Sequence, residues 1–99
     1  MIAPSPNTYD TVQRLNAVCD RVKARVQKFQ GSWQGRLNTY LTALSLYTQG
    51  IMQLKAILKK LEYGSRLYAH VQKNLKIMQK LHLATHAQML RFKTTHGFA

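Results

Sequence analysis

Apolar residues in the middle of the chain recur at alternating spacings of three and four positions. This run is unbroken from residue 37 to residue 61, and its members are Leu37, Tyr40, Leu44, Tyr47, Ile51, Leu54, Leu58 and Leu61. Such spacing is typical of a heptad pattern, in which one face of a helix packs against its neighbours. We therefore expect these eight residues to form a helix-packing seam. Further apolar residues beside the seam, such as Leu46 and Ile57, indicate that this helix contacts more than one neighbour.

The first third of the chain shows the same spacing. Its apolar positions are Val12, Leu15, Cys19, Val22, Val26 and Phe29. Ser5 before Pro6 is a favourable helix start, because a serine can cap the helix and proline is tolerated at its first position. Gly31 and Gly35 interrupt the pattern, and Ser32 between them can cap the next helix. The pattern thus predicts helices over about 5–30 and 33–62.

A looser apolar stripe follows the segment Tyr63-Gly64-Ser65, in which a glycine can end one helix and a serine can cap another. The stripe consists of Tyr68, Val71, Leu75, Met78, Leu81, Met89 and Phe92. The predicted fold class is all-α, an antiparallel three-helix bundle with its last helix over about 65–92. A glycine can also be tolerated inside a helix, so a two-helix hairpin with one long helix over 33–92 remains the alternative.

We expect residues 1–99 to form a single helical domain with short flexible ends at about 1–4 and 94–99. Residues 37–54 carry no charge, but the segment contains several amide and hydroxyl side chains, so we do not expect it to span a membrane. The start of the chain has neither an apolar run nor a basic residue, and one cysteine cannot form a disulfide framework. These features favour an intracellular protein and leave leaderless secretion open.

The excess of basic over acidic residues indicates that the predicted bundle binds an anionic partner. Fifteen lysines and arginines oppose only Asp10, Asp20 and Glu62, which gives a formal net charge of +12. Such a domain repels itself unless anions are near. We expect a partner that is nucleic acid, an acidic protein or an anionic membrane surface, and the composition alone does not choose among them.

The predicted third helix carries the clearest cationic pattern. Its basic residues recur at spacings of three and four, and they are Arg66, His70, Lys73, Lys76 and Lys80. These spacings place them on one helix face along about 20 Å, where successive cations can meet successive phosphates. We therefore name them as the candidate polyanion-binding residues, with an ordinary solvated face as the alternative. No aromatic residues alternate with these charges, which argues against base stacking.

Candidate catalytic and metal-binding residues are scarce. Three acids, no glycine-rich phosphate loop and no carboxylate beside a histidine leave little for catalysis, so we expect no enzyme activity and no cofactor. His82 and His86 share a helix face, but a third metal ligand would have to come from His70, His96, Cys19 or a distant acid. We expect no metal site. The position of Cys19 within the apolar stripe favours a small buried side chain over a nucleophile.

The turn before the second helix carries a Trp-x-Gly motif, Trp33-Gln34-Gly35. A Trp-x-Gly turn between two amphipathic helices resembles the small secreted helical-hairpin proteins of the early-secreted-antigen type. This resemblance implies a four-helix dimer that leaves the cell through a specialised bacterial secretion system. The chain departs from that family in its basic charge. It also lacks the tyrosine followed four residues later by an acid, because Tyr63 is followed by Leu67 and Tyr68 by Gln72.

Together these patterns predict a non-enzymatic helical subunit of a larger assembly. Heptad-type packing would supply contacts to a protein partner or to a second copy, and the basic face would dock onto nucleic acid or an acidic partner. The secreted hairpin of the Trp-x-Gly type is the alternative.

Overall fold

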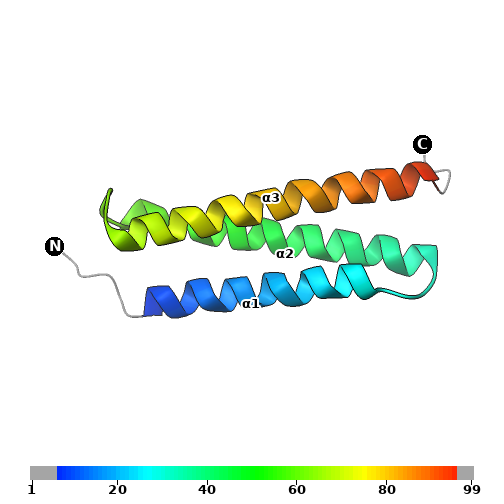
Figure 1. The fold of residues 1–99 in the computed structure, drawn as a ribbon, viewed down its shortest axis with the longest axis horizontal. Helices are drawn as coiled ribbons and strands as arrows, with labels where there is room; N and C mark the ends of the chain where they lie inside the picture. The colour runs from blue at the N-terminus through cyan, green and yellow to red at the C-terminus, as the bar shows by residue number, and fades with distance from the viewer. Residues whose placement is uncertain (1–6, 96–99) are drawn as a thin grey trace.

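The computed structural model describes residues 7–95, which form three α-helices and no strand. Helix α1 covers Asn7–Lys28, α2 covers Trp33–Lys60 and α3 covers Arg66–Thr95. The helices run antiparallel in chain order, so that the turn between α2 and α3 lies at the same end as the start of α1 (Figure 1). The predicted all-α fold and the three-helix bundle are therefore confirmed. The predicted cap at Ser5 and Pro6, and the chain ends at 1–4 and 96–99, lie outside the described residues.

The breaks between helices have the predicted local causes. The Oγ atoms of Ser32 and Ser65 accept hydrogen bonds from the backbone N–H groups of Gly35 and Tyr68, both at 3.1 Å. Each bond satisfies one of the N–H groups that a helix start leaves unpaired. Gly64 has a φ of +86°, a conformation that L side chains disfavour. This backbone reversal at Gly64 separates α2 from α3 and rules out the single long helix.

Helix α3 is longer than its pattern predicts. We expected it to end near residue 92, followed by a flexible tail, but it continues to Thr95. The hydroxyls of Thr94 and Thr95 donate to the carbonyl oxygens of Leu90 and Arg91, at 3.0 and 2.9 Å. The prediction of a tail from residue 94 is wrong for these two residues, because the apolar stripe that defined the helix ends one turn before its backbone hydrogen bonds do.

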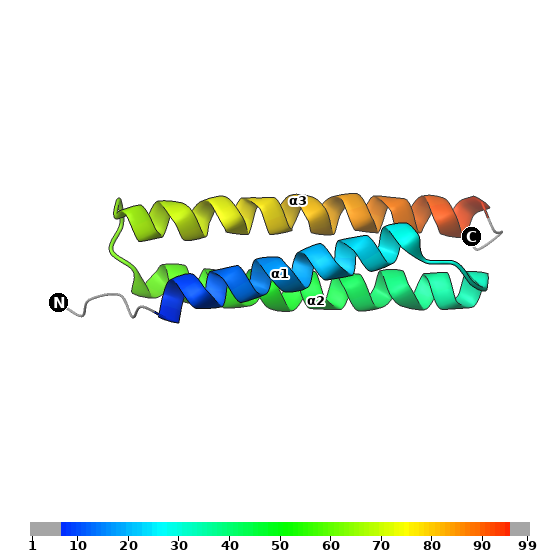
Figure 2. The ribbon, with the colours of Figure 1, turned by 60° about the horizontal axis from the view of Figure 1, so that its bottom comes forward.

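The hydrophobic core runs along the length of the bundle, with α1 lying over the pair formed by α2 and α3 (Figure 2). Helices α2 and α3 share the largest interface and α1 touches α3 least. The largest fully buried side chains of the core are Tyr47, Leu54, Met78, Val12 and Val71. Every residue of the predicted α2 seam is buried or partly buried, although Leu37, Leu44, Ile51 and Leu58 lie at its edge.

The buried centre of α2 is rotated from the seam toward two small residues that the apolar pattern did not include. Ala43 and Gly50 are both buried. A Cβ atom at position 50 would lie 2.9 Å from the Sδ atom of Met78, so the absence of a side chain there lets α2 and α3 approach closely. The bundle is about 55 Å long and 14 Å deep in its Cα trace. Two layers of helices give that depth.

Candidate functional site

The outward face of α3 presents a row of four exposed cations. Arg66, Lys73, Lys76 and Lys80 are all exposed, and we refer to them as the cationic row. The row spans about 21 Å at 1.5 Å per residue. It stands on a helix of 30 residues whose sequence contains no aspartate or glutamate. The row is therefore a surface of one sign of charge on a rigid element.

His70, the fifth residue of the predicted binding set, lies in a different environment. Its side chain is half-buried, and its ring packs against Tyr9 of α1 with 5.3 Å between the ring centroids. The contact places His70 on the edge of α3 that faces α1, whereas the cationic row faces outward. His70 thus takes part in helix packing, and the exposed row consists of the other four residues.

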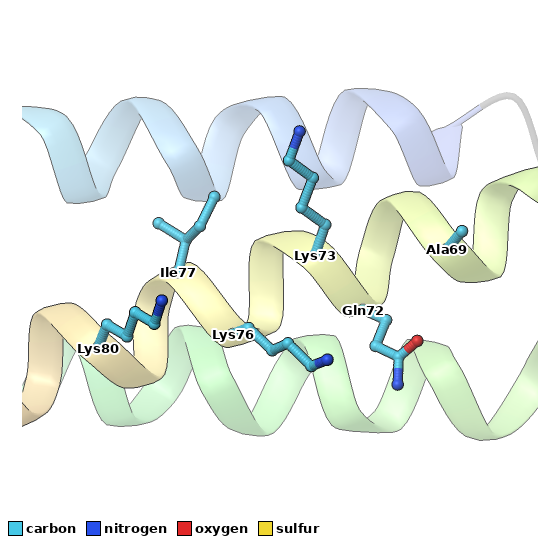
Figure 3. Close-up of a pocket in the computed structure, with 6 residues that line it drawn as sticks. All are labelled: Ala69, Gln72, Lys73, Lys76, Ile77 and Lys80. Carbon is cyan, nitrogen blue, oxygen red and sulfur yellow. The ribbon is translucent and has the colours of Figure 1, made fainter.

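The cationic row borders an open hollow of about 430 Å³ on α3. Its lining residues are Ala69, Gln72, Lys73, Lys76, Ile77 and Lys80. Figure 3 shows the side chains of Lys73 and Lys76 leaving α3 toward opposite sides, with the exposed Ile77 beyond them and the small Ala69 at the other end of the hollow. Long, flexible cationic side chains that leave a helix toward both sides can contact an anion that is wider than one helix face.

The three acidic residues lie outside the helix that carries this face, although Glu62 is only four residues before Arg66. Asp10 and Asp20 belong to α1, and Glu62 lies in the connection between α2 and α3. Helices α2 and α3 contain no acidic residue. All lysines and arginines except Arg36 and Lys93 are exposed, so the net charge of +12 lies at the surface. This arrangement attracts polyanions and is sensitive to salt.

Cys19 occupies a structural position, whereas His82 is half-buried and His86 is exposed. Cys19 is a buried core residue, and burial raises the pKa of its thiol, with the charge of Asp20 adding to the effect. A thiol of raised pKa is a poor nucleophile at neutral pH. Residues 7–95 contain no group of three histidine, cysteine or acidic side chains placed to hold a metal ion, and His96 lies outside this range.

Three buried polar groups escaped the sequence pattern. Asn74 and Thr85 lie in the core stripe of α3, where they continue the three-and-four spacing between apolar neighbours. The hydroxyl of Tyr47 is buried without a hydrogen-bond partner of good geometry, although Thr85 is near enough to affect its pKa. The spacing of Asn74 and Thr85 was the available signal, since a polar residue in register with a stripe is a candidate for a buried hydrogen bond.

The Trp-x-Gly motif forms the first turn of α2. Trp33 is the first residue of the helix and is half-exposed, while the N–H of Gly35 is held by Ser32. The ring of Phe29 lies nearest to Gly35 across the turn. The guanidinium of Arg36 donates to the carbonyl oxygen of Phe29 at 3.2 Å.

Arg36 also anchors the turn to the end of α3. Its guanidinium carbon lies 5.6 Å from the ring centroid of Tyr40 and 6.0 Å from that of Phe92. These contacts fix the end of the bundle and leave Arg36 half-buried. Its charge therefore has a structural role that the cationic row does not have.

Comparison of the chain with known protein families, with curated proteins and with solved structures finds no match. None of the three helices, over the described residues, is both long and apolar enough to cross a membrane.

Proposed function

We propose that this protein is a non-enzymatic docking subunit of a larger assembly, and that the cationic row of α3 binds the phosphate backbone of nucleic acid. The observation that carries the proposal is the exposure of Arg66, Lys73, Lys76 and Lys80 on one face of an acid-free helix. Phosphate contacts need cations in a fixed spatial order and no base-specific groups. The row supplies such cations and lacks stacking aromatics between them.

The proposed mechanism is electrostatic positioning. Binding of four phosphates releases the counterions that those phosphates hold in solution, and this release favours the complex at low salt. The rest of the bundle holds α3 straight, so the cations keep their spacing without a large loss of conformational entropy on binding. The contacts carry no sequence information, and we expect similar affinity for different duplex sequences.

The salt dependence of binding to a DNA duplex tests the proposal. For four phosphate contacts, the slope of log K against log salt is expected to be about −3.6. A variant in which Lys73, Lys76 and Lys80 are glutamine should lose about 2.7 of that slope and weaken binding alike on unrelated sequences. Fluorescence anisotropy with a labelled duplex measures both quantities.

The matched control removes the same amount of charge from α1. Arg14, Arg21 and Arg25 are exposed and arginine-to-glutamine changes there should leave most of the slope unchanged. A slope that is unchanged in the lysine variant but reduced in the arginine variant would move the interface to α1. Binding that is undetectable at tens of micromolar protein and physiological salt would overturn the nucleic-acid proposal and favour an acidic protein as the partner.

A further inference from the structure

One face of the α2–α3 pair carries exposed apolar residues that none of the three helices in residues 7–95 covers. The exposed side chains are Leu41 and Met52 of α2 and Leu83 and Leu90 of α3, and we refer to these four residues as the uncovered face. Leu83 and Met52 are 69% and 65% exposed. Solvation of large apolar side chains at this level is unfavourable and is typical of surfaces that a partner buries.

On α2 these residues lie opposite the side that packs against α1. Helix α1 meets α2 at a crevice where Val22 and Arg25 lie beside Thr39 and Leu46. At about 100° per residue, Leu41 is turned by about 140° from Leu46 and about 160° from Thr39. Met52 is turned by only about 20° from Leu41, so both face away from α1.

The same relationship holds on α3. Leu81 and Gln88 border a second crevice together with Lys23 and Val26 of α1. Leu83 and Leu90 are turned by about 160° from Leu81 and Gln88 respectively, and therefore point away from α1. The uncovered face thus lies on the side of the α2–α3 pair opposite to α1.

The antiparallel register brings the two halves of this face to the same level. The ring of Tyr40 lies 5.7 Å from that of Phe92, so the following residue of α2, Leu41, is level with Leu90. Leu37 and Leu44 are half-buried on the α2 side between Leu41 and the core. Together they make an apolar strip between two antiparallel helices, which is the position that a fourth helix occupies in a four-helix bundle.

The charge around the strip indicates which helix it accepts. Lys55 and Lys59 of α2 are exposed and lie on the same side of the helix as Leu41, while Lys93 of α3 lies near Leu90. Neither helix has an acidic residue that could pair with a basic partner. A second copy would bring another +12 charge to the interface, and this repulsion opposes self-association.

We propose that the uncovered face binds an amphipathic helix of a partner protein, with a leucine-type apolar stripe flanked by aspartate and glutamate. The partner's stripe covers Leu41, Met52, Leu83 and Leu90, and its carboxylates pair with the lysines at the margins. Lys76 and Lys80 of the cationic row border this face, because they are turned by only about 20° and 60° from Leu83. The proposal does not depend on phosphate binding.

The test uses the full chain and a synthetic helical peptide of about 24 residues, with leucines at the seam positions and glutamates beside them. A first control peptide has the glutamates replaced by lysines, and a second keeps the glutamates but has serines in place of the leucines. Fluorescence anisotropy should detect binding of the peptide with leucines and glutamates, and of neither control peptide. The reason is that the site requires both apolar contact and negative charge.

Protein variants assign the binding to the uncovered face. The double change Leu83→Gln and Leu90→Gln should weaken peptide binding by at least about tenfold. Ile77→Gln is the matched control, since Ile77 is a similarly exposed apolar residue of α3 outside this face. It should change the affinity less than about twofold, as should the double change Arg66→Gln and Lys73→Gln, since both residues are turned by about 80–100° from Leu83 and lie more than two helical turns away. Circular dichroism melting checks that each variant is folded.

Three results would overturn the proposal. In the first, the double glutamine variant binds the peptide as tightly as the wild type does. In the second, the serine peptide binds as tightly as the leucine peptide. The third is self-association of the protein. In the last case, sedimentation of the protein alone would show a dimer that the double variant abolishes, and the face would belong to a second copy. Weaker duplex binding by the Arg66→Gln, Lys73→Gln variant with intact peptide binding would leave this proposal standing, so failure of the phosphate proposal is distinguishable from failure of this one.

Discussion

The side-chain amide of Asn16 on α1 donates a hydrogen bond to Oδ1 of Asn74 on α3, with 2.6 Å between the two atoms. The Nδ2 group of Asn74 in turn donates to the carbonyl oxygen of His70 at 2.8 Å. Asn74 is buried, so these bonds compensate for the loss of water around its amide. The pair joins the two helices that share the smallest interface in the bundle. It therefore fixes the register of α1 where apolar packing constrains it least.

Replacing one asparagine of this pair should lower the free energy of unfolding more than replacing both. Asn74→Leu leaves Asn16 without its acceptor and should lower the free energy of unfolding by about 1–2 kcal/mol. The double change Asn16→Leu, Asn74→Leu should recover most of that loss, since two apolar side chains of similar size need no hydrogen bond. Urea unfolding of both single variants and the double variant gives the coupling. Losses that simply add would show that the two amides act independently.

The double leucine variant should also lose specificity of register. A buried polar pair can specify one alignment of packed helices even where it adds little stability. Spin labels at exposed positions of α1 and α3 should give a broader distance distribution in the double variant than in the wild type. An equally narrow distribution would mean that apolar packing alone aligns α1.

Removing the buried hydroxyl of Tyr47 should not destabilise the protein at neutral pH. This hydroxyl has no hydrogen-bond partner of good geometry, so Tyr47→Phe removes a polar group whose burial is uncompensated. We expect the free energy of unfolding at pH 7 to stay unchanged or to rise by up to about 1 kcal/mol. A loss of more than about 1 kcal/mol in urea unfolding would show that the hydroxyl is bonded, with Thr85 as the nearest candidate.

The same variant should change the stability at alkaline pH. Burial raises the pKa of Tyr47 above its usual value, while the neighbouring Thr85 side chain lowers it in part. Because the unfolded chain then releases this proton at lower pH than the folded protein, the stabilising contribution is complete below about pH 10 and is lost as pH rises above it. Tyr47→Phe lacks this loss, so its advantage over the wild type should grow between pH 9 and pH 11. A constant difference across that range would contradict the raised pKa.

Aspartate substitutions of leucines along α2 should destabilise the protein more, the more deeply the replaced side chain is buried. Leu54 is fully buried, Leu44 and Leu58 are half-buried, and Leu41 is exposed. Leu54→Asp places an unpaired charge in the core and should unfold the domain, since such a charge costs several kcal/mol. Leu44→Asp and Leu58→Asp should each lower the melting temperature without abolishing folding, because their carboxylates can reach water. Leu41→Asp is the control and should have little effect on melting in the absence of a partner.

The turn between α2 and α3 should tolerate asparagine at position 64 better than alanine. No atom lies within 4 Å of a Cβ built on Gly64, so any cost of substitution comes from the backbone conformation. At its φ of +86°, alanine should reduce the free energy of unfolding by about 1 kcal/mol and asparagine by less. Thermal unfolding by circular dichroism measures both. An alanine variant that is more stable than the wild type would mean that residue 64 does not need a positive φ in the folded protein.

The positions and approximate bounds of the helical segments followed from local chemistry in the sequence, although α3 continues beyond the predicted end to Thr95. The three-and-four spacing of apolar residues set the helical faces, and the caps at Ser32 and Ser65 marked where two helices begin. Gly64 marked the turn, but only its positive φ in the fold excluded a continuous helix. These features are local because helix formation and capping depend on residues within about one turn of each other.

Tertiary structure decided what each helical face contacts. The heptad pattern located the α2 seam, but the rotation of that seam toward Ala43 and Gly50 depends on how closely α3 approaches. The spacing of the basic residues placed His70 with the lysines, whereas Tyr9 of α1 holds its ring in the bundle. The exposure of Leu83 and Leu90 likewise follows from the side on which α1 packs. Side chains project from a helix of 3.6 residues per turn in all directions around its axis. Only contacts between residues distant in sequence determine which of these side chains are buried.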